Sequence, residues 1–115
     1  MSNPPVRYGK VIRLRPEKEA EYRELHNAVW PGVESMIQAC NMRNFSIFLH
    51  EFPDGNKYLF MVYDYVGDDH AADGAKMAAD PETQRWWKLT DPCQESLANS
   101  NGEWWSTMEE VYRLD

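Results

Sequence analysis

The chain has 115 residues, of which 43% are hydrophobic and 13% aromatic, an ordinary composition for a globular protein. One domain covering residues 1–115 is expected, because a chain of this length can bury a sufficient core without disulfide or metal staples. The formal net charge of -7 disfavours nucleic acid and anionic membrane surfaces as partners and suits a neutral ligand better.

The first two predicted elements are a strand and a helix. Residues 8–15 alternate with a period of two, which predicts a strand that carries three residues on one face: Lys10, Ile12 and Leu14. Pro16 suits the first turn of the following helix, and Asn41 suits its end. Apolar residues recur between them at spacings of three and four, so one long helix is expected, kinked or restarted at Pro31.

Residues 43–52 and 58–66 predict the two strands of a β-hairpin. The first alternates, with Phe45, Ile47 and Leu49 on one side and Phe48 on the other. The intervening Pro-Asp-Gly-Asn at 53–56 suits a tight reversal.

Two short helices and a last strand are expected in the C-terminal half. Asp68 or Asp69 can cap a helix ending at Ala79, and Asp80-Pro81 opens a second helix that runs through Lys88. Residues 93–102 are expected to form a loop. Residues 104–114 alternate as a strand, with one side made of Trp104, Ser106, Met108 and Tyr112.

The resulting order, β-α-β-β-α-β, predicts an α+β, ferredoxin-like fold with a four-stranded antiparallel sheet and its helices on one face. Phe48, Trp104 and Met108 are expected on the uncovered face. An uncovered apolar face needs a partner, so a homodimer of the dimeric α+β barrel type is the simplest solution.

His26 is the sharpest candidate for chemistry. Tyr22 lies one helical turn before it on the same face, and Asn27 and Trp30 are close in sequence. Imidazole is the usual proton donor or acceptor near neutral pH. The plainer interpretation is a surface histidine beside a tyrosine that only packs.

Two tryptophan pairs are the other conspicuous features. Trp86 and Trp87 point about 100° apart on a helix, so one of them must leave the core-facing stripe and either lines a ligand site or forms an interface. Trp104 and Trp105, on a predicted strand, are expected to point to opposite faces.

Several other kinds of site have no support in the sequence. His26, His50 and His70 lack the spacing of metal ligands, and no phosphate-binding loop or nucleophile motif is present. Cys40 and Cys93 are expected to be reduced packing residues. The N-terminus lacks the pattern of a signal peptide and no apolar run approaches the ~18 residues of a membrane span, so a cytoplasmic protein is predicted.

Four segments together carry a family resemblance: Tyr22-x-x-x-His26-Asn27-x-x-Trp30-Pro31, residues 44–49 (Asn-Phe-Ser-Ile-Phe-Leu), residues 84–88 (Gln-Arg-Trp-Trp-Lys) and residues 108–112 (Met-Glu-Glu-Val-Tyr). In this collinear order, over nearly the whole chain, the sequence resembles the L-rhamnose mutarotase family. The resemblance implies a cytosolic dimer that interconverts the α and β anomers of L-rhamnose without a cofactor or metal.

The resemblance also implies roles for individual residues. His26 matches the family's proton donor, and Tyr22, Trp86 and Trp87 match residues that contact the sugar. Phe45 matches a sugar-contacting tyrosine, whose hydroxyl this chain lacks, and the difference bears on the preference for L-rhamnose.

Two other functions are compatible with the same pattern. One is a cofactor-free oxygenase of the dimeric α+β barrel type, which would hold a conjugated or phenolic substrate. The other is a sugar-binding module without turnover, whose binding would survive His26→Ala.

Overall fold

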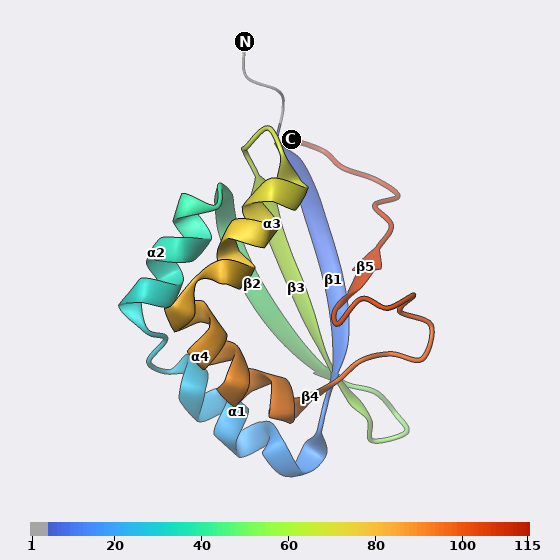
Figure 1. Cartoon of the computed structure of the whole chain (residues 1–115). Helices are drawn as coiled ribbons and strands as arrows, with labels where there is room; N and C mark the ends of the chain where they lie inside the picture. Colours follow the sequence, from blue (N-terminus) through green and yellow to red (C-terminus); the bar gives the residue numbers. More distant parts are fainter. Residues whose placement is uncertain (1–4) are drawn as a thin grey trace.

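The computed structural model describes residues 5–115, and in it four helices cover one face of a curved antiparallel sheet (Figure 1). The elements are, in chain order, β1 (Val6–Leu14), α1 (Glu19–His26), α2 (Pro31–Ala39), β2 (Met42–Glu51), β3 (Lys57–Tyr65), α3 (His70–Ala79), α4 (Pro81–Thr90), β4 (Gln94–Glu95) and β5 (Ser106–Met108). Short 3-10 turns at Pro16–Lys18 and Asp91–Cys93 precede α1 and follow α4. The strands lie in the order β2-β3-β1-β4, and β5 also pairs with β1, so the predicted ferredoxin-like α+β arrangement is confirmed.

The predicted long helix is two helices, because it restarts at Pro31. Trp30 has extended backbone (φ -64, ψ 135), the conformation that a following proline favours, and α2 begins at the proline itself. The predicted end is also confirmed, since Asn41 adopts a left-handed φ of 66° just after α2. The break separates α1, which carries His26, from α2, which packs on α4 and β2.

The core lies between the sheet and the helices. Ile12 and Leu14 of β1, Leu59 of β3 and Cys93 are fully buried there, and Tyr22 of α1 is buried beside them. Fully burying one large aliphatic side chain contributes about 1.5–3 kcal/mol, so these contacts hold α1 firmly on the sheet.

Side-chain caps begin both C-terminal helices, as the sequence predicts. Asp69 accepts a hydrogen bond from the Ala72 N–H at the start of α3. Asp80 accepts from both the N–H and the hydroxyl of Thr83 at the start of α4, at 2.9 and 2.8 Å. Each cap satisfies a helix N–H that would otherwise have no partner.

A β-bulge interrupts β2 where Asn44 and Phe45 face Tyr63 of β3. Within the bulge, Asn44 has a left-handed φ of 53°, a conformation that asparagine tolerates better than most residues. The bulge sends the two side chains to opposite faces: Asn44 bonds Asp64 on the outer face, and Phe45 stacks on Tyr63 on the helix side.

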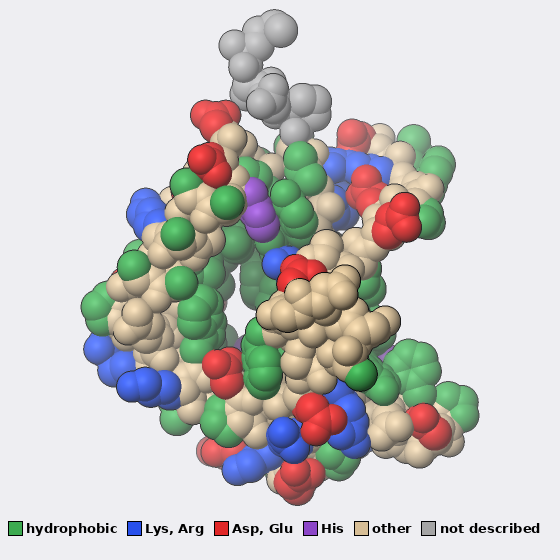
Figure 2. Space-filling model, turned by 45° about the vertical axis from the view of Figure 1, so that its right-hand side comes forward, with side chains coloured by type: hydrophobic (Ala, Val, Ile, Leu, Met, Phe, Trp, Pro, Cys, Tyr) green, Lys and Arg blue, Asp and Glu red, His purple; other side chains and the backbone are tan. Residues whose placement is uncertain are grey.

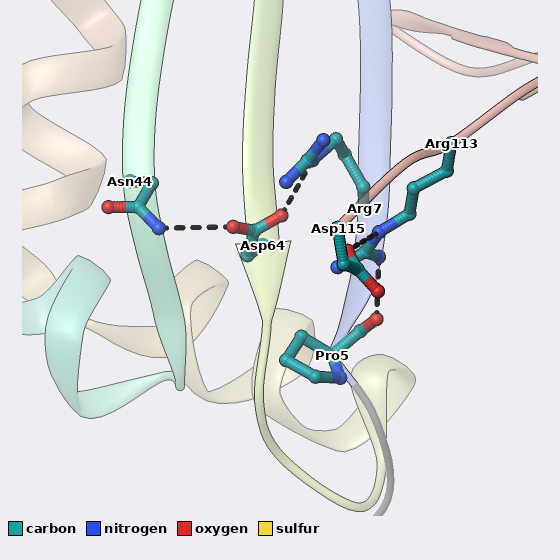
Figure 3. Close-up of polar contacts among 6 residues, drawn as sticks. All are labelled: Pro5, Arg7, Asn44, Asp64, Arg113 and Asp115. Atoms are coloured by element: carbon teal, nitrogen blue, oxygen red, sulfur yellow. Dashed lines mark hydrogen bonds and ion pairs between the residues drawn. The ribbon is translucent and has the colours of Figure 1, made fainter.

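Polar contacts tie the outer face of three strands together (Figure 3). Asp64 of β3 accepts hydrogen bonds from Arg7 of β1 at 2.8 Å and from Asn44 of β2 at 3.0 Å. Arg113 donates to the Pro5 carbonyl at 2.7 Å, which holds the C-terminal segment beside the start of β1.

The predicted strand at residues 104–114 is wrong over most of its length. Only Ser106–Met108 pairs with β1, and Gln94–Glu95, inside the predicted loop, pairs with β1 as well. Asn101 and Gly102 (φ 56° and 87°) reverse the chain in between, as the two central residues of a turn closed by a Glu103 N–H to Ser100 carbonyl bond.

The turn changes where the tryptophans point. Strand geometry starts only at Ser106, so alternation does not govern Trp104 and Trp105, and both lie on the helix side of the sheet rather than on opposite faces. Phe48 and Met108 remain on the uncovered face, where Met108 lies over Gly9.

Candidate functional site

A cavity of about 690 Å³ lies between the helices and the sheet. Figure 2 looks onto it as a deep hollow with hydrophobic side chains inside and charged ones near its mouth. This volume falls within the ~300–1,000 Å³ typical of small-molecule sites. Its aromatic and polar wall consists chiefly of Tyr22, His26, Phe45, Tyr63, His70, Trp86, Trp87, Trp104 and Trp105.

All five residues predicted as a site from the sequence line this one cavity. Tyr22 and His26 come from α1, Phe45 from the bulge in β2, and Trp86 and Trp87 from α4. Trp86 is 6% exposed and Trp87 36%, so Trp86 forms the inner wall and Trp87 the rim. The fold therefore brings together groups separated by as many as 65 residues of sequence.

The His26 ring is held in one orientation. Its Nδ1 lies 2.9 Å from the Tyr22 carbonyl, and the ring packs against Tyr22 at 4.3 Å and edge-on to Trp86 at 5.4 Å between centroids. A carbonyl can only accept, so Nδ1 carries the hydrogen and Nε2 of the neutral ring keeps its lone pair. That lone pair is then free to take a proton from a molecule in the cavity.

The Tyr22 hydroxyl stays protonated at neutral pH. Burial raises the pKa of Tyr22 to about 12, against the smaller opposing effect of its hydrogen bond with Gln94. A neutral phenol beside an imidazole supplies a donor next to a proton acceptor.

Gln94 and Trp104 belong to the site but were not among the residues predicted from the sequence. The Trp104 Nε1–H donates to Gln94 Oε1 at 2.9 Å, and Gln94 Nε2 donates to the Tyr22 hydroxyl at 3.4 Å. The Ser96 hydroxyl lies 2.8 and 3.0 Å from the carbonyls of Glu103 and Trp104 and so holds this loop in place. The Asn101-Gly102 pair was the available signal, because it is a strong turn sequence.

A carboxyl group was also missed. Asp91, at the end of α4, contributes to the cavity wall although the residue as a whole is exposed. Partial burial raises the pKa of its carboxyl group, and the neighbouring Trp104 indole opposes that shift.

The other end of the cavity carries a second polar pair. A 2.7 Å hydrogen bond joins the Tyr63 hydroxyl to His70 Nε2, and the His70 ring stacks on Tyr8 at 4.1 Å. Burial, and next the charge of Lys10, lower the pKa of His70, so its ring is neutral at pH 7. Lys10, Tyr63 and His70 all line the cavity and offer hydrogen bonds away from His26.

Within residues 5–115, no three His, Cys, Asp or Glu side chains lie close enough together to hold a metal ion. Cys40 and Cys93 are buried free thiols. In the same part of the chain, no helix has the length and apolar character needed to span a membrane.

A sequence model of the family described as L-rhamnose mutarotase matches residues 7–114. The chain belongs to the L-rhamnose mutarotase family. Curated relatives of that name include proteins from Oceanobacillus iheyensis (29% identical, covering 95% of this chain and 98% of the relative) and Opitutus terrae (34% identical, covering 72% and 74%).

A crystal structure supports the same fold. L-rhamnose mutarotase FA22100 from Formosa agariphila superposes with a TM-score of 0.73 over 96% of this chain and 99% of that chain. At 21% identity this likeness concerns the fold alone. The fold similarity is therefore consistent with the family match, which was made from the sequence.

Proposed function

We propose that this member of the family is a sugar mutarotase, an isomerase that interconverts the α and β anomers of a neutral pyranose, with L-rhamnose as the first candidate. The observation that carries the proposal is the His26 ring, whose Nδ1 is bound to the Tyr22 carbonyl at 2.9 Å while the ring lines a cavity walled by tryptophan. Aromatic faces suit the C–H patches of a sugar, and the polar groups suit its hydroxyls.

Ring opening requires the transfer of one proton, from the anomeric hydroxyl to the ring oxygen by way of His26. His26 Nε2 takes the proton of the anomeric hydroxyl while the bond between C1 and the ring oxygen breaks. The imidazolium then gives that proton to the ring oxygen, which leaves an open-chain aldehyde with a free hydroxyl. Rotation about C1–C2 and the reverse transfers close the ring on the other face, so His26 acts as base and then as acid.

The proposed roles of the other residues follow from their places in the wall. Tyr22 donates a hydrogen bond to a sugar oxygen next to the reacting centre, and Trp86 and Trp87 stack against the sugar. Phe45 contributes a ring face without a hydroxyl. No resident cofactor or metal is part of the proposal, because proton transfer alone completes the reaction.

The test is NMR exchange between the anomeric protons of L-rhamnose, L-fucose, L-lyxose and D-sugars, with and without the protein. The proposal expects at least one sugar, L-rhamnose first, to exchange faster with the protein. If none does, the protein is no mutarotase; binding without faster exchange favours the sugar-binding module. Binding of a conjugated phenol instead of a sugar favours the oxygenase.

We also propose that the protein works as a homodimer. Phe48 on the uncovered sheet face is 60% exposed, and Val111, Tyr112 and Leu114 of the C-terminal segment are 78–89% exposed, an unusual load of apolar surface for a monomer. Sedimentation at micromolar concentration is expected to give twice the mass of one chain, and Phe48→Glu is expected to lower it. A wild-type mass of one chain contradicts the pairing.

A cytoplasmic location is likewise part of the proposal. The two free thiols, Cys40 and Cys93, suit a reducing compartment. Fractionation of the native host with an antibody against the protein would test the location, and recovery outside the cytoplasmic fraction would contradict it.

A further inference from the structure

The buried hydrogen bonds behind Tyr22 determine which way its hydroxyl proton points. Gln94 is 3% exposed and Tyr22 5%, so neither polar group can rely on bulk water for its partners. Two hydrogen bonds run in one line, from the Trp104 indole to the Gln94 amide and from that amide to the Tyr22 hydroxyl, and the same indole also interacts with the Asp91 carboxyl group.

The direction of this line follows from the indole. An indole N–H donates and never accepts, so the Gln94 oxygen must face Trp104 at 2.9 Å. The amide NH₂ must then face Tyr22, 3.4 Å away, and this settles the choice between the two amide orientations on chemical grounds. An NH₂ group only donates, so the Tyr22 oxygen is the acceptor of that bond.

The Tyr22 hydroxyl proton is therefore available for a hydrogen bond to another acceptor. No residue among 5–115 is recorded as accepting a hydrogen bond from this hydroxyl, and Tyr22 lines the cavity. We propose that Gln94 and Trp104 are positioning residues that aim the Tyr22 hydroxyl proton into the cavity as a donor to the substrate. The inference rests on the proposed function, and it makes Tyr22 a fixed donor beside the His26 lone pair.

The two residues behind Tyr22 come from the irregular segment that follows α4. Gln94 lies in the two-residue strand β4, and Trp104 lies beyond the Asn101-Gly102 reversal.

Gln94→Glu tests the direction of the proton, because it keeps the shape and changes the donor. When neutral, the introduced carboxyl group can still donate to Tyr22 and accept from Trp104. When ionised, it only accepts, so it pulls the Tyr22 proton away from the cavity. Burial raises the pKa of such a carboxyl group above its usual value, which brings the change into an accessible pH range.

The expected result is a kcat that falls about tenfold relative to wild type between pH 5 and pH 8, with KM changing less, as the loss of one hydrogen bond in the transition state predicts. A variant-to-wild-type ratio that stays constant with pH overturns the positioning role. Trp104→Phe removes the N–H and frees the Gln94 amide, so its kcat should fall several-fold. A wild-type kcat in folded Trp104→Phe also overturns the proposal.

A readout without turnover separates this inference from the proposed function. In protein labelled with ¹³C at the tyrosine Cζ, the Tyr22 signal of Gln94→Glu should shift with the ionisation of the new carboxyl group, whether or not any sugar reacts. A Tyr22 signal indifferent to that ionisation overturns the inference, even if the wild type is a mutarotase. A shifting signal in a protein that exchanges no sugar leaves the hydrogen-bond direction standing and removes only the proposed function.

Discussion

Replacing His26 with alanine is the most direct test of the proposed chemistry. The change removes an imidazole that packs against Tyr22 at 4.3 Å and edge-on to Trp86 at 5.4 Å between ring centroids. A general acid and base typically accelerates a reaction about 10²–10⁴-fold, which corresponds to about 2.7–5.4 kcal/mol of barrier at 1.36 kcal/mol per tenfold. Protein-catalysed anomer exchange should therefore fall by at least a hundredfold.

The same change has a separate and smaller effect on stability. Two aromatic contacts are lost, each worth about 0.5–1.5 kcal/mol, so the free energy of unfolding should fall by about 1–3 kcal/mol. That loss leaves a typical domain folded at 20 °C, where the exchange assay is run. A thermal melt of each sample keeps the loss of chemistry apart from the loss of fold.

His50→Ala is the matched control. His50 is an exposed histidine of β2 that contacts Phe52 at 4.9 Å and does not line the cavity. It should keep wild-type exchange. The measurement is saturation transfer between the two anomeric proton signals at a fixed protein concentration. An exchange rate for folded His26→Ala within threefold of wild type would refute the role of His26.

Three further predictions concern the scaffold and the wall. Trp86→Ala should weaken sugar binding and also cost about 3–5 kcal/mol of stability, because Trp86 is buried. Trp87→Ala at the rim should raise KM with a much smaller change in Tm. Equal losses of Tm in the two variants would contradict this difference. Asp80→Ala should destabilise the protein by about 0.5–2 kcal/mol in urea unfolding, since the start of α4 loses its cap, and an unchanged midpoint would contradict that role. The hydrogen bond from Arg7, with a further one from Asn44, lowers the pKa of Asp64, so this carboxylate stabilises the fold above the unfolded pKa and the stabilisation is lost as pH falls through the lower folded pKa. Asp64→Asn should flatten the decline of unfolding free energy with acid below about pH 4, and a wild-type slope in this variant would argue against the pair.

Local chemistry allowed much of the fold to be predicted from the sequence. The restart at Pro31 and the cap at Asp80 depend only on residues a few positions away, so propensity and backbone sterics suffice. Period-two alternation likewise predicted that Ile12 and Leu14 share a face, and both are fully buried. The proximity of Tyr22 and His26 follows from the helical repeat in the same way.

The pairing between segments distant in sequence could not be predicted from these local patterns. Alternation says which residues of a strand share a face, but it does not say where the strand begins, and the start of β5 at Ser106 reversed the expected place of Trp104. Gln94 of β4 pairs with Leu14 of β1, 80 positions earlier in the sequence, and no local pattern predicts this pairing.

The sequence by itself thus determined the helices, their caps, the faces of the long strands and the family to which the chain is similar, because each depends on residues that are near one another or on a collinear motif. Only the tertiary structure decided that Tyr22, His26, Phe45, Trp86 and Trp87 surround one cavity. It also brought Gln94 and Trp104 behind the Tyr22 hydroxyl, since the direction of a buried hydrogen bond depends on what donors and acceptors the whole fold places around it.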